Sequence, residues 1–364
     1  MDLRRRGALI ARELGSVLPR SARALAGENW SPTSGSGLRR LGEVALDELV
    51  LTGMTLTAPP PTVHSDLGAY PHIAAELGAL GTAGCYRDPE PLRSTGTRLR
   101  NAGRLTFEQI RYVHDPRLPE ALAAFGAPAT AVVNVLRHPG GARPWLVWVH
   151  GAGQGNLSDF AVARVRRLHR DLGYNIAMPI QPGHGVRRRW APTYPDTDPI
   201  ANVAGMMRAV SETRAVLRWV APQARTVALS GLSLGSGVAA LAAGLEDGID
   251  GVAVYTPIRG LNQMIAAHLH RWGGVADDVG ALLNSAEVEA LTAVIDPCSM
   301  TPRVSPERRL VVGAWSDRMA FRDPALALHE RWGGRLYWHD GSHVGHLMSP
   351  RVQVVTEEFL TGLQ

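Results

Sequence analysis

Short apolar runs alternate with helix-like segments from about residue 104 onwards, and this alternation restricts the possible folds more than any other feature. The runs PWLVWVH (144–150) and RTVALSG (225–231) are almost wholly apolar, as is typical of strands covered on both faces. The segment SLGSGVAALAAGL (233–245), which follows the second run, reads as a helix. Repeated strand–helix order predicts the α/β class, with a mostly parallel central sheet and helices on both of its faces.

Two stretches fall outside this alternation and divide the chain into four segments. Residues 1–103 show no clear period apart from a helix expected over 41–54, so we predict a partly helical N-terminal extension. Residues 257–307 are too long for an ordinary connection of about 2–6 residues. Their pattern is mostly helical, and we predict a helical cap inserted over the C-terminal edge of the sheet. The core is then expected in two parts, at 104–256 and 308–364.

Charge and cysteine content limit the partners that the chain can have. The net charge is +5, and every one of the 38 basic residues is Arg. These residues are spread along the chain without an aromatic–basic module, so we expect no nucleic-acid partner. Cys85 and Cys298 form neither a disulfide framework nor a metal-binding spacing, and we expect no metal site.

The N-terminal residues MDLRRRGALIARELG (1–15) combine early arginines with an apolar run that Arg12 and Glu13 interrupt. This pattern makes a poor signal peptide, and we expect a cytoplasmic protein. Two interpretations of the segment stay open. It is either a surface helix of the domain or a basic amphipathic helix that makes weak peripheral contact with a membrane.

A serine at a strand-to-helix corner is the strongest functional signal in the sequence. Residues 231–235 read GLSLG, a G-x-S-x-G pattern between a buried strand and a helix. In such a turn the serine hydroxyl is pushed out above the sheet, so we predict that Ser233 is a nucleophile rather than a simple helix cap. The N–H of Leu234 begins the next helix, where donors lack helical partners and the dipole favours negative charge. We therefore expect Leu234 in an oxyanion hole.

A serine hydroxyl is a weak nucleophile and needs a base, and the base needs a group that orients it. Candidates follow Ser233 in the expected order of acid and then histidine. Asp317 ends a predicted strand in GAWSD, and His343 lies in the loop after the last predicted strand. We predict Asp317 as the acid and His343 as the base. The reserves are Asp323 and Asp340 for the acid and His346 for the base.

Two loops add candidate binding groups. The segment WVHGAGQGN (148–156) follows the third predicted strand of the core, and the N–H of Ala152 is the expected second oxyanion donor. The segment GVRRRWAP (185–192) is either a solvated loop or an anion clamp, because guanidinium groups bind carboxylates and phosphates bidentately. In the clamp interpretation Arg187 and Arg188 bind substrate. The adjacent His184 is expected to be structural, with substrate binding as the alternative.

Five motifs together resemble the α/β-hydrolase superfamily in its serine esterase/lipase-like form. They are, in chain order, WLVWVHGAG, IQPGHG, LSGLSLGSG, GAWSDR and GSHVGHL, and the resemblance covers residues 104–364. It implies a nucleophile elbow at Ser233 and hydrolysis of a small-molecule carboxylic ester or thioester through an acyl-enzyme, with no cofactor. Two alternatives stay open: an acyltransferase on the same triad, and a catalytically retired hydrolase fold that serves as a binding or scaffold protein.

Overall fold

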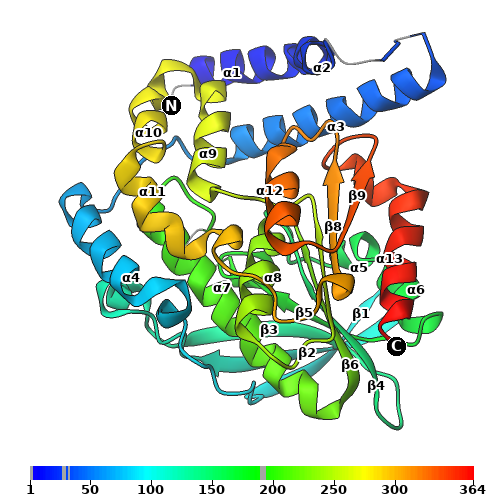
Figure 1. Cartoon of the computed structure of the whole chain (residues 1–364). Helices are drawn as coiled ribbons and strands as arrows, with labels where there is room; N and C mark the ends of the chain where they lie inside the picture. The colour runs from blue at the N-terminus through cyan, green and yellow to red at the C-terminus, as the bar shows by residue number, and fades with distance from the viewer. Residues whose placement is uncertain (1–2, 27–29, 32, 189–193) are drawn as a thin grey trace.

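A nine-stranded sheet forms the centre of the computed structural model, which describes residues 3–26, 30, 31, 33–188 and 194–364 (Figure 1). The strand order is β1-β2-β3-β5-β4-β6-β7-β8-β9. The strands are β1 (Gly96–Ala102), β2 (Leu105–His114), β3 (Ala129–Leu136), β4 (Arg143–Val149), β5 (Asn175–Ile180), β6 (Ala224–Leu232), β7 (Gly251–Tyr255), β8 (Arg309–Ala314) and β9 (Arg335–His339).

The pairs β1–β2, β2–β3 and β3–β5 are antiparallel. The six strands β5, β4, β6, β7, β8 and β9, which are neighbours in this order, are all parallel. The carboxyl ends of the parallel strands therefore meet at one edge of the sheet. Every residue of β5, β7 and β8 is buried, as expected for strands covered on both faces. The predicted α/β class and mostly parallel sheet are confirmed.

Helices cover both faces of the sheet and enclose two hydrophobic cores. One core lies under α7 (Pro199–Val220), α8 (Leu234–Leu245) and α12 (Asp323–Trp332). The other lies under the short helices α5 (Asp159–Val162) and α6 (Val165–Arg170) together with α13 (Pro350–Gly362). Short 3-10 helices lie in the connections between these strands and helices: η2 (Glu120–Phe125), η3 (Gly185–Arg187), η4 (Ala221–Gln223) and η9 (Gly345–Met348).

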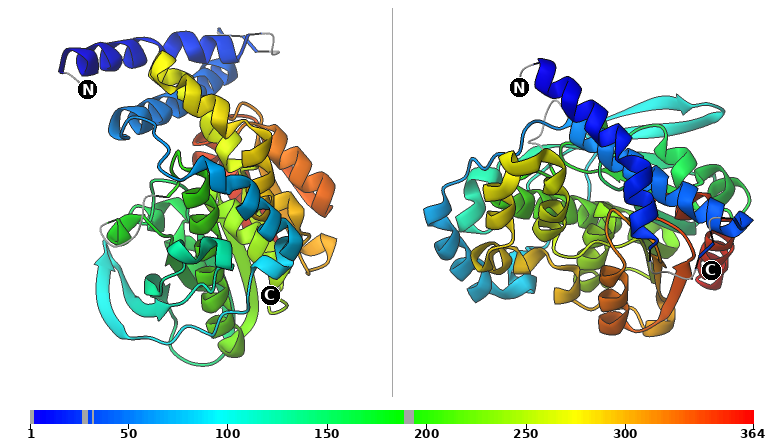
Figure 2. Two further views of the ribbon diagram at one scale, coloured as in Figure 1. Left: turned by 90° about the vertical axis from the view of Figure 1, so that its left-hand side faces the viewer. Right: turned by 90° about the horizontal axis from the view of Figure 1, so that it is seen from above.

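The N-terminal segment is largely helical and crosses the carboxyl edge of the sheet. It contains α1 (Leu3–Gly15), α2 (Val17–Ala24), α3 (Gly35–Thr57), η1 (Leu67–Ala69) and α4 (Tyr70–Cys85). Helix α3 passes above the ends of β8 and β9, and α1 and α2 lie on its outer side (Figures 1 and 2). The sheet itself begins at Gly96, because β1 pairs with β2 along its whole length. It thus starts within the last residues of the predicted extension.

The segment between β7 and β8 consists of short helices. They are α9 (Leu261–Leu269), η5 (His270–Ala276), α10 (Asp277–Leu283), α11 (Ala286–Thr292), η6 (Ala293–Ile295), η7 (Pro297–Ser299) and η8 (Pro306–Arg308). Helices α9 and α10 rise beside α1 and α3, whereas α11 packs against α4 and α7 (Figure 1). Among the described residues, no helix has both the length and the apolar character needed to cross a membrane.

Candidate active site

Ser233 stands at the corner between β6 and α8 in a backbone conformation that is rare for a residue with a side chain. Its φ is 53° and its ψ is −119°. The N–H of Ser233 donates a 2.9 Å hydrogen bond to the carbonyl of Tyr255 at the end of β7. A β-carbon on Gly235 would overlap the carbonyl oxygens of Val149 and His150. Close packing of α8 on the end of β4 therefore requires glycine at this position.

Asp317 and His343 are hydrogen-bonded to each other at the same edge of the sheet. His343 Nδ1 lies 2.7 Å from Asp317 Oδ2. The other carboxylate oxygen, Oδ1, accepts 2.8 Å hydrogen bonds from the N–H groups of Met319 and Ala320. Burial by itself would lower the pKa of His343. The adjacent Asp317 carboxylate, assisted by Asp47, outweighs burial and raises this pKa above its ordinary value of 6.5.

Sheet topology places this pair on the same side of the molecule as Ser233. Ser233 follows β6, Asp317 follows β8, and β7 alone lies between these two strands. Parallel neighbours are about 4.8 Å apart, so two strand spacings of about 10 Å separate the chain at these points. The loop after β9 carries His343 back over Asp317.

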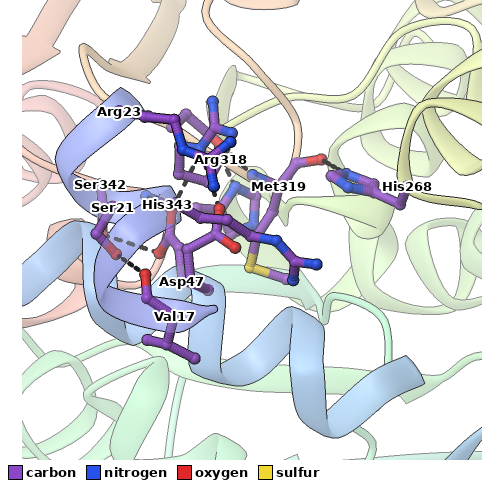
Figure 3. A network of polar contacts seen from close by, with 12 residues as sticks. Val17, Ser21, Arg23, Asp47, His268, Arg318, Met319, Ser342 and His343 are labelled. Carbon is purple, nitrogen blue, oxygen red and sulfur yellow. Dashed lines mark hydrogen bonds and ion pairs between the residues drawn. The ribbon is translucent and has the colours of Figure 1, made fainter. Parts of the chain in front are cut away.

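A second carboxylate, Asp47 of α3, contacts the loop that carries His343. Asp47 is fully buried. Its Oδ2 accepts from the N–H of His343 at 2.9 Å and of Arg318 at 3.0 Å, and its Oδ1 accepts from Ser342 Oγ and the N–H of Val344, each at 2.8 Å (Figure 3). Sequence analysis missed Asp47, since its only signal was an acidic residue on the inner face of a predicted helix.

Other side chains of α3 contact the same two loops. Glu43 Oε2 lies 2.9 Å from His339 Nε2, at the end of β9. Arg40 Nε donates to Ser316 Oγ at 2.8 Å, and Glu48 accepts from Arg318 Nε at 3.2 Å. The second oxygen of Glu48 pairs with the buried Arg271 of η5 at 2.6 Å. Helix α3 thus forms hydrogen bonds and ion pairs both with the core and with the inserted helices.

The reserve base His346 lies in η9 and is fully enclosed. Its Nδ1 is hydrogen-bonded to the carbonyl of His343, and its ring stacks against that of Tyr255. Burial lowers the pKa of His346 to about 3. This environment favours a structural imidazole, and of the two histidines His343 alone hydrogen-bonds Asp317 among the contacts that the structure describes.

The arginine loop contains the residues of the predicted anion clamp. Arg187 is completely buried, pairs with Glu212 at 2.6 Å and donates to the carbonyl of Ile180. These contacts favour a structural role for Arg187, and its binding of substrate stays a prediction. Arg188 is exposed, and its role stays a prediction, while residues 189–193 lie outside the described part of the chain.

His184 is buried beside His150. Its Nδ1 lies 2.8 Å from the carbonyl oxygen of Pro182, and burial lowers its pKa to about 4. These contacts agree with the structural role that was expected of His184.

A cavity of about 230 Å³ opens beside Ser233, and its walls are largely apolar. Ala152 and Leu234, the two expected oxyanion donors, line it together with Ser233. Leu234 is the first residue of α8, where backbone N–H groups lack helical acceptors. The other lining residues come from α3, α9 and nearby loops: Leu51, Met54, Thr55, Ala58, Pro59, Pro61, Pro195, Asp196, Thr197, Leu261, Met264, Ile265, His268, Leu269, Trp272 and Met319.

The side chains that could ligate a metal, and the two cysteines, lie as follows in the described part of the chain. No three His, Cys, Asp or Glu side chains within them gather as metal ligands. Both cysteines are free, and burial raises the pKa of Cys85 and of Cys298 to about 11. Thiols with such pKa values are weak nucleophiles at neutral pH.

Comparison with known proteins identifies relatives over most of the chain. The proteins Rv2627c and MT2702 of Mycobacterium tuberculosis, strains H37Rv and CDC 1551, both described as uncharacterized, are each 30% identical to it over 328 residues. Each alignment covers 84% of this chain and 78% of the relative. No family model matches the chain.

Among solved structures, the acetyl xylan esterase from Paenibacillus sp. R4 superimposes with a TM-score of 0.52. The superposition covers 83% of this chain and 96% of the esterase, at 18% sequence identity. At this identity the likeness concerns the fold alone.

Proposed function

Because the chain belongs to one family with the Mycobacterium tuberculosis protein Rv2627c and has the α/β-hydrolase fold, we propose that it is a serine hydrolase of carboxylic esters or thioesters. One observation carries the proposal. A strained serine at a strand-to-helix corner shares the carboxyl edge of the sheet with a hydrogen-bonded Asp317–His343 pair. A serine nucleophile, a histidine base and an orienting carboxylate are the groups that acyl transfer requires.

In the proposed mechanism, His343 Nε2 takes the proton of Ser233 Oγ as this oxygen attacks the substrate carbonyl carbon. Asp317 accepts the Nδ1–H bond of His343, which selects the tautomer with a free Nε2 and stabilises the imidazolium that forms. The imidazolium then gives its proton to the leaving alcohol or thiol, and the acyl group stays on Ser233. Water attacks this ester with His343 again as base, which releases the acid and restores the serine.

Charge on the substrate oxygen has to be stabilised in both steps. The N–H groups of Leu234 and Ala152 are the proposed donors, and both residues line the cavity beside Ser233. Gln154 supports the Ala152 turn, because its Oε1 accepts a 2.6 Å hydrogen bond from the N–H of Gly151. Removal of a single oxyanion donor typically costs about 10²–10³ in kcat.

The apolar cavity supports an acyl group without charge as the substrate portion next to Ser233. Met264 of α9, Trp272 of η5 and Leu51 of α3 belong to its largely apolar wall, and Asp196 and His268 are its titratable lining residues. Buried charges without partners are unfavourable, so a charged acyl chain would bind weakly here.

A fluorophosphonate probe tests the proposal, because it reacts with activated serines. We expect the wild-type protein to be labelled at Ser233 and to hydrolyse p-nitrophenyl esters. S233A should abolish both, with ester turnover reduced by at least about 10³-fold. S94A, at an exposed serine remote from the cavity, is the matched control and should retain both. Folded wild-type protein that neither reacts with the probe nor cleaves esters would support the scaffold alternative.

Partition of the acyl group distinguishes a hydrolase from an acyltransferase. Added alcohol competes with water for the acyl-enzyme, so the ratio of ester to free acid among the products reports the preferred acceptor. A hydrolase should yield mainly free acid at millimolar alcohol. Predominant ester under these conditions would instead assign the protein as an acyltransferase.

A further inference from the structure

Helix α3 belongs to the N-terminal segment, yet it makes the densest set of hydrogen bonds to the loops that hold Asp317 and His343. The carboxylate of Asp47 accepts four bonds, all between 2.8 and 3.0 Å. One donor is the backbone of Arg318, directly after Asp317. The other three are Ser342, His343 and Val344 in the loop after β9 (Figure 3). One buried side chain therefore bridges two loops that come from different strands.

From these contacts we infer that Asp47 is a positioning residue, which holds the His343 loop and the Asp317 turn in register so that the imidazole faces Ser233. The inference rests on the proposed serine hydrolase function. Asp47 is fully buried, and its four hydrogen bonds all go to these two loops, so it acts through His343 and Asp317 rather than on the substrate.

The donor set around Asp47 explains why this position needs a carboxylate. Three of its four partners are backbone N–H groups, which can only donate, and the fourth is the hydroxyl of Ser342. An ionised carboxylate has acceptor sites for all four. An asparagine would turn its NH₂ group either against Val344 N–H or against the N–H groups of Arg318 and His343. At least one backbone donor would then lose its acceptor inside the protein.

The charge of Asp47 also acts on the proposed base. Three titratable groups face the His343 ring: Asp317 from the loop after β8, Asp47 from α3 and His346 from η9. A carboxylate near an imidazole favours the protonated ring, so the two acids raise the pKa of His343 and the imidazolium of His346 would lower it. Burial raises the pKa of Asp47, and only its ionised form raises the pKa of His343, so loss of the Asp47 charge should lower the pKa of His343.

The other contacts of α3 show why Asp47 itself stays in place. Glu43 Oε2 accepts from the N–H of Ser342 at 3.3 Å. The single hydroxyl proton of Ser342 is shared between the carbonyl of Glu43 and Asp47 Oδ1, each 2.8 Å from Oγ. A β-carbon on Gly341 or on Gly345 would overlap the Glu43 carboxylate, so both glycines of the His343 loop lie directly against the Glu43 side chain. The helix and the loop form one packed unit.

D47N tests the inference, since it keeps the size of the side chain and removes the charge and one acceptor. A misplacement of about 1 Å at a reacting group can cost about 10²-fold in rate. We expect kcat on a p-nitrophenyl ester to fall by about 10²-fold while KM stays within about threefold, because the cavity walls are unchanged. The acid limb of the kcat/KM–pH profile should move to lower pH, since His343 must be neutral to act as base. A purely structural role would not move that limb.

E76Q is the matched control. Glu76 lies in α4, another N-terminal helix, and its carboxylate accepts a 2.9 Å hydrogen bond from the backbone N–H of Ala121. It touches neither loop of the site, so E76Q should leave kcat, KM and the pH profile unchanged. If D47N matches E76Q in all three measurements, the inference is overturned.

Two further measurements keep the test decisive. Should D47N fail to fold, S342A decides instead, because it removes the hydroxyl through which the His343 loop contacts both Asp47 and the carbonyl of Glu43, without a change of charge. We expect a kcat loss of about five- to tenfold with KM retained, and an unchanged kcat would refute the positioning role. NMR titration of the His343 ring, assigned with H343N, requires no activity. A pKa lowered by D47N supports the inference even if the wild-type protein fails the fluorophosphonate test, and an unaltered pKa counts against it.

Discussion

At the scale of single residues, Ser233 is one of five non-glycine residues in the described part of the chain that have a positive φ. Its φ of 53° lies in the left-handed region, where a residue with a side chain is strained by about 1–3 kcal/mol. The strain is tolerated because the hydrogen bond to Tyr255 and the packing of α8 against β4 hold the corner from both sides.

Gly235→Ala should disrupt this corner. The new methyl group would overlap the carbonyl oxygens of Val149 and His150, which are backbone atoms and cannot rotate away. We expect a loss of stability of about 2 kcal/mol or more together with loss of fluorophosphonate labelling. The control is Gly78→Ala in α4, where the methyl group would meet open space and should be neutral or slightly stabilising. Urea unfolding compares the two, and equal stabilities would contradict this account.

Residue types and their order were sufficient to predict the hydrogen bond between Asp317 and His343, because both residues directly follow recognisable strands. They were insufficient to predict the buried ion pair of Arg187, because its partner Glu212 comes from α7 and pairs with it only after folding. Asp47 was missed for the same reason: its four donors are 271 residues or more away along the chain. Local patterns carry no information about such contacts.

At the scale of elements, the strands of the parallel region were predicted to within a few residues. Their apolar runs are continuous, which distinguishes them from the amphipathic helices between them. The strand β1 was not predicted, because GTRLRNA is polar and almost wholly exposed. It is held by pairing with β2 along one edge rather than by burial (Figure 2).

Helix α3 was predicted over 41–54 and extends over Gly35–Thr57, but its position above the site could not be derived from its periodicity.

Helices α3 and α9 line the cavity beside Ser233 and should determine which acyl chains fit in it. Met264 of α9 lines the cavity, so Met264→Trp would fill part of its volume of about 230 Å³. We expect kcat/KM for p-nitrophenyl octanoate to fall by about tenfold or more relative to the acetate ester. Leu326→Trp, at an exposed position of α12, is the control and should leave the ratio unchanged. An unaltered ratio in Met264→Trp would place the acyl chain elsewhere.

At the scale of the whole molecule, buried ion pairs connect the N-terminal helices to the inserted helices. Arg271 of η5 pairs with Glu48 of α3 and lies 3.6 Å from Glu13 of α1, and all three side chains are almost completely buried. Buried charges are costly unless they are paired, so the three segments depend on one another. The predicted membrane contact of the N-terminus stays a prediction, and liposome flotation would test it.

Glu48→Gln should therefore be strongly destabilising. It leaves the buried guanidinium of Arg271 with the more distant Glu13 as its carboxylate partner, and loss of one member of a buried pair typically costs about 3–5 kcal/mol. Asp247→Asn is the control, because its pair with Arg303 is exposed and should contribute less than about 1 kcal/mol. Urea unfolding midpoints provide the measurement, and equal midpoints for the two variants would refute the dependence.

The bond between α3 and the loop after β9 joins residues that are 296 positions apart. At a translation rate of about 5–20 residues per second, α3 is made roughly 15–60 s before the loop that donates hydrogen bonds to Asp47. Ser233 follows Asp47 by 186 residues and precedes His343 by 110, so a nascent chain carries the proposed nucleophile before the loop that binds α3 has been made. Under the proposed function, a polypeptide terminated before His343 should be inactive.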